Sequence, residues 1–165
     1  MVPVYRKASG ELRVVLVRRT DGGAHGGQIA LPGGKREPGD ESFIDTALRE
    51  ANEEIGIQPD KVEVLVELPE VVTITTRFHI HPFLCRIVPC NPWRIEEREI
   101  AEVFDVAVRT LADPGLRGES VEQFPSWPEP RKIEFLRIGP HRLWGATFRI
   151  LDPLVPRLLD GDWGV

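Results

Sequence analysis

The stretch ALREANEEIG, from Ala47 to Gly56, decides how this chain is interpreted because it brings three glutamates into ten residues. Glu50, Glu53 and Glu54 share one side of a predicted helix, and Arg49 is the only basic residue in the stretch. Like charges three or four residues apart on a helix each cost on the order of 0.2 to 0.5 kcal/mol, and the helix dipole disfavours anions in the last turn. The cluster is therefore either a solvated acidic face or a set of carboxylates kept for binding.

The residues around these glutamates predict the limits of the helix and the face that it buries. Asp40 or Ser42 can cap the N-terminus, and Gly56 can end the helix in a left-handed conformation. Apolar residues recur at spacings of one, three and four on a single face, as in a helix that packs on a sheet. These residues are Ile44, Ala47, Leu48, Ala51 and Ile55. The glutamates border this face, so we expect them at the edge of the core.

The segment before the helix favours a binding site over a solvated acidic face. Residues 26–42, GGQIALPGGKREPGDES, form a long glycine-rich segment that leads directly into the helix. Glycine lets the backbone come close to a ligand, and carboxylate oxygens are the ligands that Mg²⁺ and Mn²⁺ prefer. The loop and the helix together predict a site for a metal-bound phosphate.

Composition limits the class of protein. With 165 residues, 41% hydrophobic and 28% charged, the chain is predicted to form a single domain over residues 1–165. The sequence has neither an apolar run of about 18 residues nor a secretory signal pattern, so we expect a cytoplasmic protein without a membrane partner. A formal net charge of −5 disfavours a nucleic acid polymer as partner. Cys85 and Cys90 fit no disulfide or zinc pattern.

Strand patterns flank the helix. Residues 12–19, LRVVLVRR, are apolar and β-branched, which predicts a strand buried on both faces. Residues 62–68 alternate apolar and acidic side chains, as expected for a half-buried strand, and residues 76–87 continue a strand pattern. Strands on both sides of a helix predict a mixed α/β (α+β) fold with a sheet between helices.

A second helix is predicted near the C-terminus, where apolar residues recur at helical spacing over residues 143–158. Pro153 and Pro156 are expected to kink or restart it. This helix could pack on its own sheet or on a second copy, so a homodimer is possible. Residues 122–132 hold three prolines and are expected to form an irregular loop.

Residues 33–57, GGKREPGDESFIDTALREANEEIGI, resemble the Nudix box, G-x5-E-x7-R-E-U-x-E-E-x-G-U, where U is a bulky aliphatic residue. The matching residues are Arg49, Glu50, Glu53, Glu54, Gly56 and Ile57. Ala51 stands where the pattern has a larger aliphatic residue, and fourteen residues separate Gly34 from Arg49 where the pattern has thirteen. The first acidic position of the box therefore falls on either Asp40 or Glu41.

The resemblance implies a Nudix-type α/β/α sandwich and a Mg²⁺- or Mn²⁺-dependent hydrolase of a pyrophosphate linkage. By analogy, Glu50, Glu53 and Glu54 are metal ligands, and Arg49 orients Glu50 through a charge-assisted hydrogen bond. A general base must reach the attacking water, and either Glu53 or Glu99 can serve. The remaining candidates for this base are Glu96, Glu97 and Glu102.

Other segments resemble the coenzyme A diphosphatases within this superfamily. The likeness covers Leu16, Val17, Arg19, Thr20 and His25, then residues 27–34, 99–108 and 143–151. It implies cleavage of coenzyme A or its thioesters into 3′,5′-ADP and 4′-phosphopantetheine. The segment DGGA, residues 21–24, is shorter than the subgroup pattern, and Leu31 replaces a phenylalanine. ADP-ribose or an oxidised nucleoside triphosphate is the alternative substrate, and a non-catalytic Nudix-fold binding module is a third hypothesis.

The substrate is expected to be a small molecule, bound by the glycine-rich loop and by basic side chains. Gly33 and Gly34 would let backbone approach a phosphate, and His25 either touches that phosphate or is simply exposed in the loop. The 3′-phosphate of coenzyme A should be bound by an arginine. Three arginines, which the sequence does not rank, are candidates: Arg19, Arg36 and Arg77.

Overall fold

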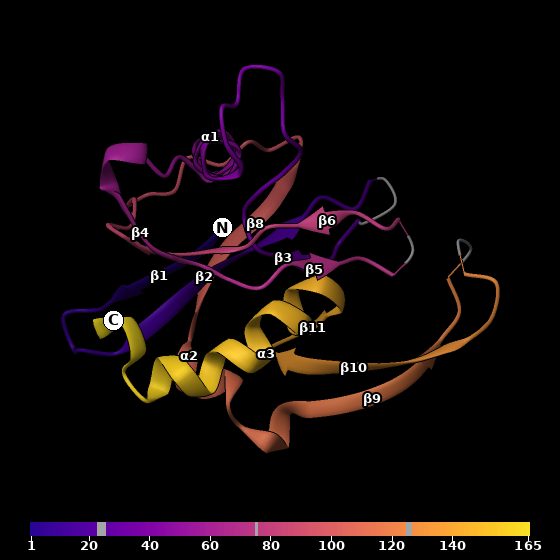
Figure 1. Ribbon diagram of the computed structural model, residues 1–165. Helices are drawn as coiled ribbons and strands as arrows, with labels where there is room; N and C mark the ends of the chain where they lie inside the picture. The colour runs from indigo at the N-terminus through magenta and orange to yellow at the C-terminus, as the bar shows by residue number, and fades with distance from the viewer. Residues whose placement is uncertain (23–25, 75, 125–126) are drawn as a thin grey trace.

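A computed structural model describes residues 1–22, 26–74, 76–124 and 127–165 of the protein. Within these residues, a six-stranded mixed sheet lies between helix α1 (Phe43–Ile55) and helix α3 (Gly145–Leu159) (Figure 1). The strands of this sheet are β1 (Val2–Arg6), β2 (Leu12–Arg19), β3 (Ile29–Ala30), β4 (Val62–Glu67), β7 (Phe83–Ile87) and β8 (Ile100–Ala107). The predicted α/β class with a mixed sheet between helices is confirmed.

The order of strands in this sheet is β3-β2-β1-β7-β4, and β8 pairs with β2. Strands β1 and β7 are parallel, whereas the other pairs are antiparallel. Along one edge β2 pairs first with β1 and then with β3, and along its other edge it pairs with β8. Strand β2 thus lies in the interior of the sheet, and its C-terminal end, at Arg19, meets the start of β8.

Strand β2 is buried on both faces, as its sequence predicts. Val15 and Val17 belong to the apolar cluster under α1, whereas Val14 and Leu16 belong to the cluster under α3. All four side chains are at most 1% exposed. Because side chains alternate along a strand, Arg19 points to the same side as Val17, toward α1, and Arg18 points to the opposite side.

Helix α1 begins and ends at residues that its sequence favours. Ser42 caps the N-terminus in a capping box with Asp45, so Ser42 and not Asp40 is the cap. Gly56 ends the helix in the left-handed conformation, with φ 78°. On the face of α1 that packs on the sheet, Ala47, Ala51 and Ile55 are buried. The other two residues of the predicted apolar face, Ile44 and Leu48, are partly buried and pack against the same cluster.

The strand pattern over residues 76–87 corresponds to two separate strands. The segment divides into β6 (His79–Ile80), which pairs with β5 (Val71–Val72), and β7, which joins the main sheet. Pro82 lies between β6 and β7, and it has no N–H to continue a strand ladder. Its carbonyl instead accepts a hydrogen bond from the Leu68 N–H at 2.8 Å.

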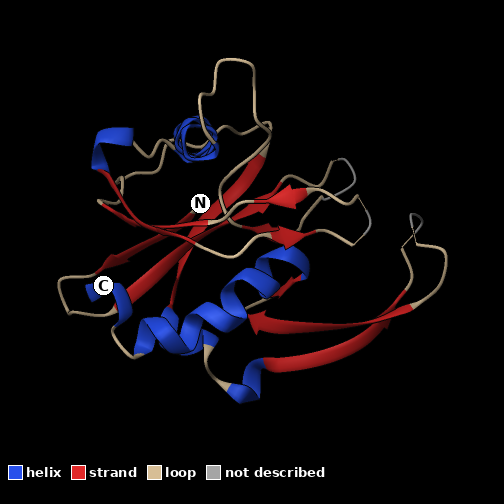
Figure 2. Cartoon of the chain, viewed as in Figure 1, coloured by secondary structure: helices blue, strands red, loops and turns tan. Residues whose placement is uncertain are grey.

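Helix α3 continues through both of its prolines, so it does not restart there (Figure 2). Pro153 and Pro156 lie on its exposed side, where water can satisfy the carbonyls that the missing N–H groups leave free. The opposite side of α3 is buried against the sheet of the same chain. Its buried apolar residues are Phe148, Ile150, Leu151, Leu154, Val155 and Leu158.

The remaining elements lie between β8 and α3. They are α2 (Val108–Leu111) and a three-stranded antiparallel sheet of β9 (Arg117–Glu122), β10 (Arg131–Ile138) and β11 (His141–Trp144). Three short 3-10 turns complete the described chain: Pro59–Lys61, Pro114–Leu116 and Asp162–Gly164. In the segment expected to be an irregular loop, residues 123–124 and 127–130 form neither helix nor strand, residues 125–126 lie outside the described residues, and the two ends belong to β9 and β10. No described helix is long and apolar enough to span a lipid bilayer.

Gly56 is required at the end of α1 for two reasons. Its φ is positive, and a Cβ there would lie 2.7 Å from the Cβ of Arg94. We expect Gly56→Ala to lower the free energy of unfolding by about 1 to 3 kcal/mol, measured by urea denaturation. Gly10 is the matched control, because it has a φ of +83° and an added Cβ there would meet nothing within 4 Å. Gly10→Ala should lose only about 1 kcal/mol; an equal loss would mean that the Arg94 contact yields freely.

Candidate active site

The glycine-rich loop lies directly against the glutamates of α1. The backbone nitrogen of Met1 donates to the Pro32 carbonyl at 2.8 Å, which ties the loop to β1. The Gly33 N–H donates to Glu54 Oε2 at 3.0 Å, and a Cβ at Gly34 would lie only 2.3 Å from the carboxyl of Glu50. Gly33 and Gly34 therefore allow the backbone to contact both carboxylates, as the sequence predicts for a close approach.

Arg49 and Asp40 form the most tightly bonded pair of the site. Arg49 donates to both oxygens of Asp40 at 3.0 Å, and Asp40 also accepts from the Thr46 hydroxyl and the Glu37 N–H at 2.9 Å. These contacts hold the pKa of the Asp40 carboxyl well below its ordinary value and raise the pKa of Arg49. Glu41 is exposed. Of the two residues that the sequence left open for the first acidic position, Asp40 is the one that contacts Arg49.

Arg49 also reaches the glutamates and the loop. It donates to Glu53 at 2.9 Å, to Glu50 at 3.2 Å and to the Lys35 carbonyl at 2.9 Å. The contact expected between Arg49 and Glu50 is present. Asp40 and the Lys35 carbonyl fix the orientation of the Arg49 guanidinium. Its hydrogen bonds to Glu50 and Glu53 therefore hold these two side chains in place.

Glu54 is a buried carboxylate with weak compensation. Its residue is 3% exposed, and this burial raises its pKa to about 7, against the opposing effects of the Gly33 N–H and Arg19. The neighbouring carboxylates of Glu50 and Glu99 raise the pKa further, and burial also raises the pKa of Glu50. The site thus carries more negative charge than its own cations neutralise.

Glu99 reaches this site from the segment before β8. The Thr20 N–H donates to the Glu99 carbonyl at 2.9 Å, and the Glu96 N–H donates to the Glu54 carbonyl at 3.0 Å. The Arg19 guanidinium lies between the two acids, at 3.7 Å from Glu54 and 3.8 Å from Glu99. Glu99 stands just before β8, which begins at Ile100.

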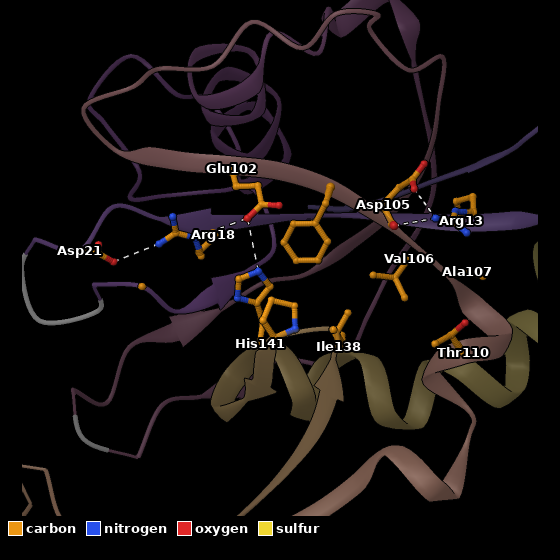
Figure 3. A pocket seen from close by; sticks show the side chains of 14 residues that line it. Arg13, Arg18, Asp21, Glu102, Asp105, Val106, Ala107, Thr110, Ile138 and His141 are labelled. Atoms are coloured by element: carbon orange, nitrogen blue, oxygen red, sulfur yellow. Dashed lines mark hydrogen bonds and ion pairs between the residues drawn. The ribbon is translucent and has the colours of Figure 1, made fainter.

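The rival bases lie differently. The carboxylate of Glu96 accepts from the Arg98 N–H at 3.3 Å, and Glu97 is exposed. Glu102 lies within β8 and points away from α1, at 3.7 Å from Arg18 and 3.5 Å from His141 (Figure 3). It lines a separate pocket of about 680 Å³ on the other side of the sheet.

The predicted substrate-binding residues are only partly together. Arg36 donates to the Asp40 and Glu41 carbonyls at 2.9 Å, so it braces the loop. Arg77 is exposed, with φ 52°, next to Phe78, whose ring lies 5.2 Å from the Lys35 ammonium. His25 lies outside the described residues. No pattern in the sequence indicates the contact between Lys35 and Phe78, because it joins two separate loops.

The residue types fit a divalent cation, although their side chains are not gathered around one. Among the described residues, no three acidic, histidine or cysteine side chains converge as a metal centre. Instead, Arg49 holds Glu50 and Glu53, while Arg19 lies between Glu54 and Glu99. Oxygen donors with uncompensated buried charge are the donor set that Mg²⁺ and Mn²⁺ prefer.

Comparison with known proteins agrees with this geometry. Residues 1–142 match the family model described as NUDIX domain. A protein named "Uncharacterized Nudix hydrolase NudL" from Salmonella paratyphi B is 34% identical over 166 residues, covering 93% of this chain and 78% of its own. The same values hold for the relative of that name from Salmonella newport.

Solved structures with lower sequence identity share the fold. The MutT protein from Methanosarcina mazei superposes with a TM-score of 0.55 at 20% identity, covering 96% of this chain and 91% of that one. The Nudix hydrolase RenU from M. smegmatis gives a TM-score of 0.57 at 24% identity, with 69% and 74% covered. Because the family model spans most of the chain and the glutamates, the arginine and the glycines of the box meet in one place, this protein belongs to the NUDIX domain family.

Proposed function

We propose that this protein is a divalent-cation-dependent hydrolase that cleaves the pyrophosphate linkage of coenzyme A or its thioesters into 3′,5′-ADP and 4′-phosphopantetheine. The observation that carries the proposal is the contact of the glycine-rich loop with Glu50 and Glu54. This contact places loop backbone that a phosphate could approach next to carboxylate oxygens that a divalent cation prefers. The coenzyme A assignment is supported by the resemblance of Leu16, Val17, Arg19, Thr20, His25 and residues 27–34, 99–108 and 143–151 to that subgroup.

Glu50, Glu53 and Glu54 would hold Mg²⁺ or Mn²⁺. Bound there, such an ion would neutralise phosphate charge and make a water molecule more acidic. Arg49 is a positioning residue in this proposal, since it is anchored on Asp40 and contacts Glu50 and Glu53. Its anchoring keeps these carboxylates on the side of α1 that faces the loop.

Glu99 is the general base that the contacts favour. Its side chain is 55% exposed, and its ion pair with Arg19 at 3.8 Å is longer than a hydrogen bond. Glu53 is instead bonded to Arg49 at 2.9 Å and is assigned in this proposal to the metal ion. Glu99 can therefore take the proton of the attacking water while α1 supplies the ligands.

The adenosine end of coenzyme A suits the surface beside the loop. Lys35 and Arg77 are cations next to the ring of Phe78, which is 51% exposed. An aromatic ring stacks on adenine and cations bind phosphate. Arg36 is occupied by backbone carbonyls, and Arg19 lies beside the carboxylates of Glu54 and Glu99 rather than beside Phe78, so Arg77 is the favoured ligand for the 3′-phosphate.

Product analysis tests the substrate class. The purified protein is incubated separately with coenzyme A, dephospho-coenzyme A, ADP-ribose and 8-oxo-dGTP, each with Mg²⁺ or Mn²⁺, and the products are separated by chromatography. We expect 3′,5′-ADP and 4′-phosphopantetheine from coenzyme A, with slower cleavage of the dephospho form because it lacks the 3′-phosphate. Cleavage of ADP-ribose or 8-oxo-dGTP with coenzyme A untouched would replace the substrate, and cleavage of none would favour a binding module.

Glu54→Gln separates catalysis from folding. The amide keeps an acceptor for the Gly33 N–H and carries no charge that burial penalises, so the free energy of unfolding should be unchanged or slightly higher. Turnover should fall by about 10² or more, because a metal ligand is lost. For Glu53→Gln we likewise expect little change in the free energy of unfolding and a fall in turnover of about 10² or more. Glu102→Gln is the control, since Glu102 points away from α1, and near-full turnover of Glu54→Gln under saturating Mg²⁺ would contradict the assignment.

Gly34→Ala moves one carboxylate without removing it. The new Cβ would displace the flexible end of Glu50 rather than backbone, so the unfolding midpoint should change little. Mn²⁺ affinity, measured by the electron paramagnetic resonance of free Mn²⁺, should fall by roughly tenfold, since one ligand is displaced. Gly39→Ala in the same loop is the matched control, because no atom lies within 4 Å of its added Cβ. Equal affinities of the two variants would show that Glu50 does not bind the metal.

A further inference from the structure

We propose that Arg19 is a built-in competitor of the divalent cation: it shares the carboxylates of Glu54 and Glu99, yields them when the cation binds, and then binds a phosphate of the substrate. The inference rests on the proposed function, since it assumes that a cation binds at the α1 glutamates. It adds a coupling between metal binding and substrate binding that runs through one side chain of β2.

The two arginines of the site are held very differently. Arg49 is bonded to both oxygens of Asp40 at 3.0 Å and to the Lys35 carbonyl at 2.9 Å. Arg19 lies 3.7 Å from Glu54 and 3.8 Å from Glu99, both beyond hydrogen-bonding distance, and its side chain is 36% exposed. Arg49 is thus a fixed part of the site, whereas Arg19 is exchangeable.

The exchange requires only a side-chain movement. The backbone around Arg19 is anchored, because its N–H donates to the Gln28 carbonyl at 3.0 Å and the Thr20 N–H donates to the Glu99 carbonyl at 2.9 Å. A guanidinium on a flexible stem can turn from the carboxylates to a neighbouring anion while these bonds stay in place.

Electrostatics sets the direction of the exchange. Arg19 gives the buried Glu54 a single positive charge at 3.7 Å. A divalent ion held by Glu54 would bring two charges closer to that carboxylate than the single charge of Arg19, so Arg19 would be repelled and would release both Glu54 and Glu99. The released guanidinium then faces the loop, where a phosphate is the ligand that it binds best.

Direct metal titration tests this competition. Mn²⁺ is titrated into the substrate-free protein at about pH 8, where carboxylates are largely ionised, and free Mn²⁺ is followed by electron paramagnetic resonance. We expect Arg19→Gln to bind Mn²⁺ about three- to tenfold more tightly than the wild type, the size expected for loss of one weak ion pair. Arg18→Gln is the matched control, because Arg18 pairs with Asp21 and Glu102 on the other side of the sheet.

Steady-state kinetics distinguishes this role of Arg19 from a purely structural one, because the two predict different combinations of KM and Mn²⁺ affinity. With coenzyme A as substrate, Arg19→Gln should raise KM although it tightens Mn²⁺ binding, whereas a general loosening of the site would weaken both. Arg19→Lys keeps the charge and should return Mn²⁺ affinity toward the wild-type value. The unfolding midpoint of each variant shows whether the fold is kept.

The outcomes separate this inference from the proposed function. If the wild type binds Mn²⁺ and Arg19→Gln binds it no more tightly than Arg18→Gln does, the competition is wrong and the metal site stands. If Arg19→Gln binds more tightly with an unchanged KM, the phosphate contact is wrong. If the wild type binds no Mn²⁺ at millimolar concentration, the proposed function fails and this inference with it.

Discussion

The paired hydrogen bonds between Arg49 and Asp40 are the interaction on which the rest of the site depends. They join the first turns of α1 to the end of the glycine-rich loop, and the same guanidinium then reaches the Lys35 carbonyl, Glu50 and Glu53. A planar group with five donors can satisfy acceptors in several directions at once. Lysine could not replace it, because a point charge lacks this fixed geometry.

A second constraint comes from the sheet. The pairing of β2 with β8 brings Arg19 beside Ile100, so that Glu99 arrives at the last turn of α1. The packing of α1 on Val15 and Val17 fixes the position of the helix over β2. Glu99 and the three glutamates of α1 therefore meet because β2 carries both the helix and the edge strand.

Local patterns in the sequence predict a large part of this arrangement. The apolar face of α1, its end at Gly56 and the buried strand at residues 12–19 follow from periodicity and from residues with special backbone preferences, and all three are confirmed. The box residues 49, 50, 53 and 54 could be singled out because their spacing is dense and specific. Their roles stay predictions, since the comparisons show the family and not the chemistry of single residues.

The parts that the sequence does not predict depend on contacts between distant segments. Spacing alone left Asp40 and Glu41 equivalent, and only the position of Arg49 distinguishes them. Glu99 and Glu102 are both candidate bases in the sequence, and only the pairing of β8 with β2 places Glu99 near Arg19 and Glu102 near Arg18. Pro82 and Pro153 have the same local chemistry, but one separates two strands and the other lies in a continuous helix, because only the second faces water on its free side.

The location of β8 at the edge of the sheet has a consequence for how the site opens. Within the described residues β8 pairs with β2 alone, and α1 packs over its start, where Ile100 is buried in the same cluster as Ala51 and Ile55. Edge strands exchange their amide hydrogens through local openings that cost less free energy than global unfolding. Opening of β8 would therefore carry Glu99 away from the three glutamates of α1, and it requires Ile100 to leave its buried position in the cluster that it shares with the helix.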